Sequence, residues 1–267
     1  MARWLARPEH PLTARVWVNR LWQHHFGRGL VATPNDFGAQ GEPPSHPELL
    51  DWLACDLIRH GWRLKRLHRL IMNSAVYRQD GRFDEARAQI DRENVFLWRQ
   101  APRRLEAEPI RDAMLQAAGL LDLRMYGPGT LDPNMRRRSV YFFIKRSQLI
   151  PMLMLFDWPE HLVSIGQRAT TTTAPQALLF MNSPQAQQYA ESLAHRFKGQ
   201  ADGPAVERAY RIVFSRAPAA PEEQLALDFL RRQSVAYQEA GREDAEQRAR
   251  VDLCRTLLSM DEFIYVD

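Results

Sequence analysis

The chain has 267 residues, of which 45% are hydrophobic and 25% are charged. On folding, a chain of this length buries roughly 75% of its unfolded surface, so a hydrophobic core can form without metals or disulfides. No apolar run approaches the roughly 20 residues that a membrane-spanning helix needs, and the N-terminal residues lack the apolar centre of a secretory signal. The sequence therefore predicts a globular chain with no transmembrane segment and no signal peptide.

The net charge is +4, and almost all of the basic residues are arginines. A basic protein binds nucleic acid or acidic polymers when its cations gather on one face. Here the arginines are spread along the chain near acidic residues, and the dense run at 136–138 is short. We therefore expect a solvated surface, and nucleic acid is not an expected partner.

Helical spacing of apolar residues predicts the first helix over 12–26, with Pro11 near its start and Gly27 just past its end. A loop rich in Gly, Pro, Asn and Asp follows over 27–44. These residue types adopt turn conformations readily, so we expect an irregular segment between two helices.

The second predicted helix begins at Ser45-His46-Pro47-Glu48 and ends at Gly61. Ser45 is expected to cap this helix while Glu48 reaches back to the capping residue, and Pro47 lies in the tolerated first turn. A third helix is predicted over 64–77.

The middle of the chain is less regular. Residues 79–94 are poor in apolar groups and predict a surface excursion, and a helix is predicted over 105–121 with Pro109 in its first turn or at a kink. The Gly-Pro-Gly at 127–129 predicts a break. Residues 139–144 are aromatic and β-branched, which makes them the best strand candidate.

The last third is again helical, and Thr173 with Gln176 forms a predicted capping box. Further helices are predicted to begin at Pro184, Pro204 and Pro221, and a final one lies over 251–258.

These elements predict a mainly α fold, a multi-helix single domain over residues 1–267. It has a helical N-terminal part (1–125), a β and loop connection (126–172) with a small β element near 138–146, and a helical C-terminal part (173–267). The first residues read like the end of a helix whose beginning is missing, so we expect a fragment of a larger protein.

Several motifs carry a resemblance to a known family. The chain resembles the C-terminal domain of unknown function 1553, found in large planctomycete proteins. The matching stretches are 19–31 (NRLWQHHFGRGLV), 35–38 (NDFG), 44–53 (PSHPELLDWL), 70–78 (LIMNSAVYR), 103–108, 110–112, 172–178, 182–184 and 262–267. Pro109 departs from the helix-compatible residue that is usual in the family.

The resemblance implies a context but no activity. In that family the domain follows a planctomycete-type cytochrome c module and a companion domain, in proteins that are exported to the periplasm or the cell surface. This chain has no C-x-x-C-H motif, so we expect no cofactor in it and a haem c on an upstream domain of the parent protein.

Three side chains beside the 27–44 loop are candidate metal ligands: His25, Asp36 and His46. Two imidazoles and a carboxylate are a ligand set that zinc accepts. However, the adjacent His24 and His25 point to different helix faces, and the paired-histidine spacing of helical zinc sites is absent. We therefore expect no metal site, with His25 packed at its helix end and His46 helping to cap the next helix.

The dense charges of 103–112 suggest either chemistry or structure. Glu106, Glu108 and Asp112 are candidate catalytic carboxylates, as a general acid and base whose pKa values differ, and His25 is a further catalytic candidate. The alternative, which we favour, is an ion-pair network. The candidate binding residues are Asn35, Asp36, His46, Arg104 and Arg111.

The sequence thus predicts a structural or interaction module that docks the companion and cytochrome c domains of the same polypeptide, or an extracellular polysaccharide. The alternative is a hydrolytic or redox enzyme with a polar pocket between the 35–46 loop and the helix of Glu106 and Arg111. A broad exposed apolar surface favours docking, whereas a deep polar pocket favours the enzyme.

Overall fold

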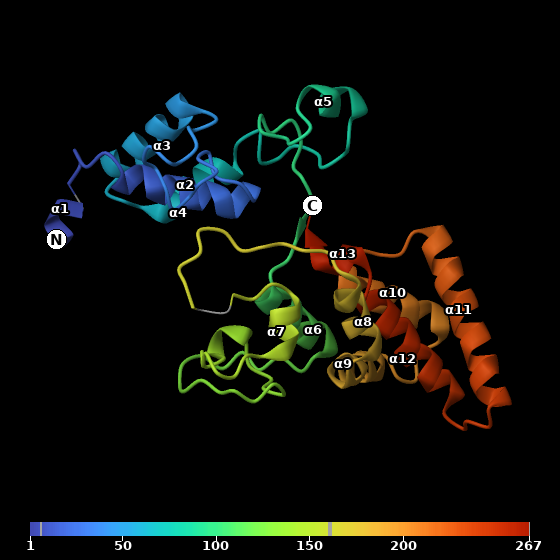
Figure 1. Cartoon of the computed structure of the whole chain (residues 1–267). Helices are drawn as coiled ribbons and strands as arrows, with labels where there is room; N and C mark the ends of the chain where they lie inside the picture. The colour runs from blue at the N-terminus through green and yellow to red at the C-terminus, as the bar shows by residue number, and fades with distance from the viewer. Residues whose placement is uncertain (6, 160–161, 267) are drawn as a thin grey trace. The chain divides into compact units, whose positions relative to one another are not determined.

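The computed structural model describes residues 1–5, 7–159 and 162–266 (Figure 1). The chain divides into two compact units: unit 1 is Met1–Arg103 with Ser164–Gln167, and unit 2 is Arg104–Val163 with Arg168–Val266. The described residues are mainly helical with one small sheet, which confirms the predicted fold class. The prediction of a single domain stays a prediction.

Unit 1 contains five helices in its described residues. They are α1 (Ala2–Leu5), α2 (Thr13–Phe26), α3 (Pro47–Arg59), α4 (Leu64–Met72) and α5 (Glu85–Ile90). The core of this unit lies where α2, α3 and α4 bring together Val18, Leu50, Leu53, Leu67 and Ile71, each of them buried.

The ends of α2 were predicted correctly, since Gly27 adopts a positive φ of 83° and its N–H donates to the Gln23 carbonyl at 2.7 Å. Such a φ costs glycine little because it has no Cβ. The next helix, α4, ends at Met72, earlier than predicted. There the Ser74 hydroxyl donates to the Ile71 carbonyl and accepts from the Tyr77 N–H, which forms a turn.

The predicted capping box at Ser45 and Glu48 is wrong. The capping position of α3 is His46, and its side chain makes no capping hydrogen bond. Ser45 instead donates its hydroxyl and its N–H to the Leu30 carbonyl, at 3.3 and 2.8 Å. The Ser45 hydroxyl therefore fastens the preceding loop rather than the helix.

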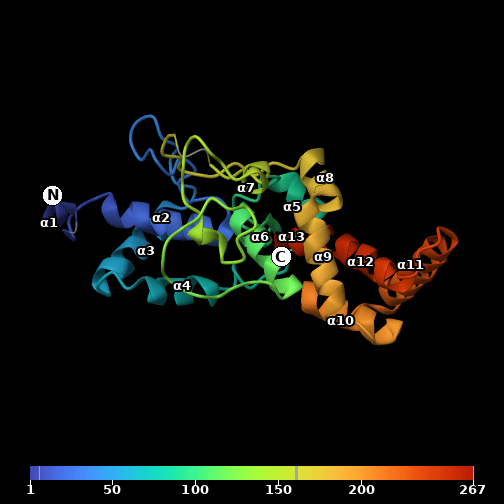
Figure 2. The ribbon, with the colours of Figure 1, turned by 90° about the horizontal axis from the view of Figure 1, so that it is seen from below.

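The strand β1 (Arg103–Arg104) spans the boundary between the two units in the sequence and pairs with β2 (Tyr265–Val266). The other elements of unit 2 are helices. The helices are α6 (Ala107–Ala118), the 3-10 helix η1 (Ser139–Tyr141), α7 (Pro151–Leu155), α8 (Ala174–Asn182), α9 (Pro184–His195), α10 (Asp202–Phe214), α11 (Ala220–Glu239), α12 (Ala245–Leu258) and α13 (Asp261–Ile264). Figures 1 and 2 show α11 and α12 side by side, and α12 also packs against α9.

The core of unit 2 forms where α6, α7, α9 and α12 meet. Small residues on α9, such as Ala190 and Ala194, are fully buried and let the neighbouring helices approach. Pro109 lies in the first turn of α6, where a proline does not interrupt the helix. No helix of the described residues has the length and apolar character needed to cross a membrane.

The small β element does not lie at 139–144. Residues 139–141 form η1, and Phe142 makes an isolated bridge with Thr130. The cause is a tertiary contact: Asp112 accepts both the Ser139 N–H and the Ser139 hydroxyl at 2.7 Å, which fixes the backbone in a turn. Such contacts override the intrinsic strand preference of the aromatic residues.

Candidate functional site

The predicted site residues fall into two groups that belong to different units. His25, Asn35, Asp36 and His46 are in unit 1, and the second group is in unit 2: Arg104, Glu106, Glu108, Arg111 and Asp112. A pocket between the two groups stays a prediction, and each group is described by itself.

In unit 1 the side chains of the 35–46 loop bond mainly to neighbouring residues. Asp36 accepts the Gly38 N–H at 2.8 Å, and Asn35 accepts a hydrogen bond from Arg20 at 2.8 Å. A Cβ added at Gly41 would lie 2.2 Å from the Asp36 carbonyl oxygen, so the chain passes too close to itself there for any larger residue. The contacts of Asn35 and Asp36 thus maintain the shape of this loop.

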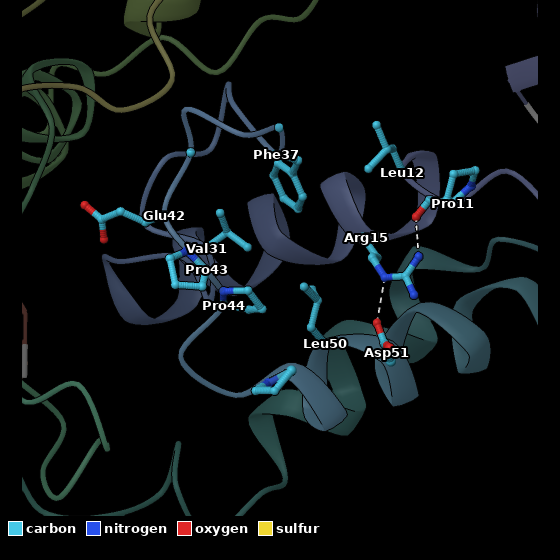
Figure 3. Close-up of a pocket in the computed structure, with 13 residues that line it drawn as sticks. Pro11, Leu12, Arg15, Val31, Phe37, Glu42, Pro43, Pro44, Leu50 and Asp51 are labelled. Atoms are coloured by element: carbon cyan, nitrogen blue, oxygen red, sulfur yellow. Dashed lines mark hydrogen bonds and ion pairs between the residues drawn. The ribbon is translucent and has the colours of Figure 1, made fainter.

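A pocket of about 480 Å³ lies beside the same loop (Figure 3). Its walls are mostly apolar, and Arg15 donates from Nε to Asp51 at 2.6 Å and from Nη1 to the Pro11 carbonyl. None of the predicted binding residues lines it; the lining side chains include Leu12, Val31, Phe37, Pro43, Pro44, Pro47 and Leu50.

The candidate metal ligands are not assembled. Nε2 of His25 lies 2.8 Å from Nδ1 of His68, whereas His46 contacts the Ser45 hydroxyl. Burial, and then the neighbouring His68, lower the pKa of His25. In the part of the chain that the structure describes, no three His, Cys, Asp or Glu side chains gather as metal ligands.

Unit 2 brings the three predicted catalytic carboxylates to one pocket of about 570 Å³. Glu106, Glu108 and Asp112 line it together with two arginines, Arg138 and Arg168. The remaining lining residues are Pro109, Ser139, Val140, Phe142, Ile144 and Trp158.

Glu108 is held as an anion at this pocket. Arg168 donates to both of its carboxylate oxygens, at 2.7 and 3.1 Å, and the Trp158 indole N–H donates at 2.9 Å. Burial alone would raise the pKa of Glu108, but the hydrogen bonds from Arg168 and Trp158 help to bring it below the usual value. A general acid needs a raised pKa, so this arrangement favours the ion-pair network.

Asp112 and Glu106 also have hydrogen-bond or ion-pair partners. Asp112 holds Ser139 as described and lies 3.6 Å from Arg111, and Glu106 lies 3.0 Å from Arg168. Each carboxylate at this pocket therefore has a cationic neighbour in unit 2. The sequence predicted an ion-pair network that ties this helix to the Asn-Asp loop of residues 35–38; the ion pairs described here join residues of unit 2, and the link to that loop stays a prediction.

Arg104 and Arg111, two of the predicted binding residues, are buried in unit 2. The Arg104 side chain is 3% exposed, pairs with Asp157 at 2.5 Å and lies over the Phe156 ring. Arg111 is 1% exposed and donates to the carbonyls of Met135 and Arg137 and to the Ser139 hydroxyl. Its burial lowers its pKa, and its guanidinium lies 4.7 Å from the Phe142 ring centroid.

The sequence did not single out Arg137, which is the middle residue of the three arginines at 136–138 and is buried. Its guanidinium donates to the carbonyls of Arg124, Tyr126 and Pro128 and lies 3.6 Å from the centroid of the Tyr141 ring. Arg136 and Arg138 are exposed. Because all three residues of this run are arginines, nothing in the sequence distinguishes the buried one.

Residues 122–146, which we call the loop surface, expose an unusual number of large apolar side chains. They are Leu123, Met125, Tyr126, Val140, Phe143 and Ile144, each at least 55% exposed. The same 25 residues contain six basic and two acidic residues, a net charge of +4 that equals the charge of the whole chain. Val140 and Ile144 also line the carboxylate pocket, so pocket and loop surface adjoin.

Two segments of the loop surface are tied together by hydrogen bonds. The Thr130 N–H donates to the Tyr141 carbonyl at 3.1 Å, the Phe143 N–H to the Thr130 carbonyl at 2.8 Å, and the Tyr126 N–H to the Tyr141 hydroxyl at 2.7 Å. The exposed side chains therefore project from backbone that is fixed by hydrogen bonds.

No curated protein and no solved structure matches the chain significantly. A family model described as PSD1, protein of unknown function (DUF1553), matches residues 1–230, which include both units' candidate residues. With most of its length matched, and in agreement with the resemblance seen in the sequence, this chain belongs to the DUF1553 family.

Proposed function

We propose that this chain is a docking module that binds a polypeptide partner through the loop surface of unit 2. The observation that carries the proposal is the set of six exposed large apolar side chains on two hydrogen-bonded segments. Large apolar side chains that are exposed close together in one part of a chain indicate an interaction site.

The composition of the loop surface supports a protein partner. Tyrosine, phenylalanine and methionine are enriched at the centres of protein interfaces, and Tyr126, Phe143 and Met125 are exposed here. Burying one such side chain contributes about 1.5–3 kcal/mol, whereas association costs about 4–15 kcal/mol. Several exposed side chains acting together are therefore enough to offset the cost.

The loop surface is also ordered before a partner binds. Arg137 binds three carbonyls of the 124–128 loop, and Arg111 binds the carbonyls of the segment that follows it. Because the loops are already ordered, less conformational entropy is lost on binding.

The pocket at Glu108 supports docking better than catalysis. Its carboxylates have Arg168 and the buried Arg111 as cationic neighbours, which suits a fixed polar wall. Beside the loop surface, such a pocket would accept one anchoring side chain of the partner.

The family resemblance suggests which partner the loop surface binds and where in the cell it does so. We propose as partner the companion domain of the same polypeptide, in an exported protein of the periplasm or cell surface that also carries a cytochrome c module. The aliphatic content of the loop surface favours a polypeptide over the polysaccharide that the sequence left open.

A selection from a random peptide library tests the proposal. Peptides would be selected on the wild-type chain and counter-selected on the double variant Phe143→Ser, Ile144→Ser. We expect peptides that bind the wild type and lose at least about tenfold in affinity for the variant, since each lost apolar contact weakens binding.

The matched control is Leu225→Ser, which removes an exposed apolar side chain from α11 in the same unit and should not affect binding. Circular dichroism would establish that both variants are folded. Recovery of no peptide that distinguishes the double variant from the control would overturn the proposal.

A further inference from the structure

We infer that the partner of the loop surface is an acidic segment, in which carboxylates alternate with apolar side chains. This inference rests on the proposed docking function and names the chemistry of the partner.

The charge distribution is the first observation. Residues 122–146 carry a net charge of +4, and the rest of the chain has equal numbers of acidic and basic residues. The whole net charge of the protein is therefore concentrated in less than a tenth of its length. Opposite charge on a partner speeds encounter and selects against basic or neutral competitors.

The second observation is that these cations are available. Lys145, Arg146 and Arg136 are exposed, and in the described residues no carboxylate pairs with them. Arg124 and Arg138 have only long contacts to carboxylates, at 3.6 and 4.0 Å, and their side chains are 73% and 58% exposed. Such exposed pairs contribute little, so a partner's carboxylates would replace them readily.

The third observation is how cations and apolar groups are interleaved. Arg124 lies between Leu123 and Met125 in the sequence, and Lys145 and Arg146 directly follow Ile144. A segment that satisfies this pattern needs acidic groups spaced among apolar ones, rather than a purely acidic run.

An anionic membrane also attracts basic and apolar side chains. The adjoining pocket favours the polypeptide, because it is lined by Val140, Ile144 and Arg138 and is large enough for one anchoring side chain. A lipid surface has no side chain that would fill this pocket. Membrane binding is therefore an outcome that the test must separate.

The test uses the peptides selected on the wild-type chain. We expect Asp and Glu to be enriched among them relative to the starting library, together with Leu, Phe or Tyr. Their affinity should fall at least about tenfold between about 50 mM and about 500 mM NaCl, because salt screens exposed charges.

The double variant Lys145→Glu, Arg146→Glu should weaken these peptides at least about tenfold. The matched control, Arg231→Glu with Arg232→Glu on α11, changes the net charge equally at exposed positions outside the loop surface. It should leave the affinity within about twofold of the wild type.

Two results would overturn the inference. The first is selected peptides that depend on Phe143 but are neutral or basic and insensitive to salt; the docking function would then stand without its acidic partner. The second is binding of the wild type to vesicles of phosphatidylglycerol and phosphatidylcholine that depends on Lys145 and Arg146, with no acidic peptide recovered. Failure to recover any peptide that depends on Phe143 would instead remove the docking function itself.

Discussion

Arg137 and Arg111 determine the conformation of the loop surface. Both are buried, and both direct their donors mainly to backbone carbonyls rather than to carboxylates. Guanidinium suits this task because its five N–H donors have a fixed planar arrangement, whereas an ammonium has three on a flexible stem. Each arginine thus orders a loop that has little regular secondary structure.

Replacement of Arg137 by lysine should loosen the loop without unfolding unit 2. A lysine keeps the charge but cannot reach the carbonyls of Arg124, Tyr126 and Pro128 at once, and each hydrogen bond that is lost removes about 0.5–1.5 kcal/mol of stability. We expect faster hydrogen exchange at residues 124–143, which mass spectrometry would resolve.

Arg136→Lys is the matched control, because Arg136 is exposed and adjacent in sequence. It should exchange like the wild type. Equal exchange in Arg137→Lys and the wild type would mean that the loop is ordered by other contacts.

At the scale of the elements, Arg216 joins three helices of unit 2. It lies just past the end of α10, pairs with Glu222 in the first turn of α11 at 2.7 Å, and pairs with Glu262 in α13 at 2.6 Å. Glu222 also accepts the Ala219 N–H at 2.6 Å, so it caps α11 while it pairs. These contacts connect the end of α10 with the first turn of α11 and with α13.

This cluster should make the stability of unit 2 depend on pH in the acid range. The hydrogen bonds of Arg216, and then the Ala219 N–H, lower the pKa of Glu222 to about 2 from its usual 4.5. A lowered pKa in the folded state stabilises the protein above the unfolded value, and this contribution is lost as the pH falls from about 4.5 towards 2. The size is modest, because Arg216 is partly exposed and solvent screens the pair.

Glu222→Gln should therefore have a lower urea midpoint than the wild type at pH 7. Near pH 2 the midpoints of the variant and the wild type should become equal. Urea unfolding across this range measures the difference. Glu239→Gln, at the exposed C-terminal end of the same helix, is the control and should show no such trend. A difference between Glu222→Gln and wild type that is constant with pH would contradict the assignment.

The sequence predicted helices well where local residues decide them. Pro184 begins α9 and Gly27 ends α2 because their backbone preferences act within one turn. It failed at 139–144, where a contact from Asp112 decides the conformation, and at Ser45, whose hydroxyl bonds to Leu30. Both failures involve a hydrogen bond to a residue distant in the sequence.

The candidate site was predicted in part for the same reason. Glu108, Asp112 and Glu106 lie within one short segment, so their closeness to one another followed from the sequence, whereas the pocket itself was predicted between the 35–46 loop and this helix. Their partners did not follow from the sequence: Arg168 is 60 residues from Glu108, and Ser139 is 27 residues from Asp112. The exposure of Phe143 and Val140 could not be predicted from the sequence either, because aromatic and β-branched residues usually indicate a buried strand.

At the scale of the whole molecule, each unit has its own hydrophobic core. Leu67 is 1% exposed in the core of unit 1, and Leu193 is 0% exposed in the core of unit 2. In the described residues, no buried apolar side chain belongs to both hydrophobic cores. We therefore expect the two units to unfold in separate transitions.

Leu67→Ala and Leu193→Ala test this expectation. Each removes buried methyl groups and should destabilise its own unit by about 2–5 kcal/mol. Hydrogen exchange in increasing urea, followed peptide by peptide, would report the two units separately. We expect Leu67→Ala to shift the protection of residues 13–72 alone, and Leu193→Ala that of residues 107–258 alone. A single transition that both substitutions move equally would instead support the one cooperative domain that the sequence predicted, because loss of packing in one core would then lower the stability of every peptide.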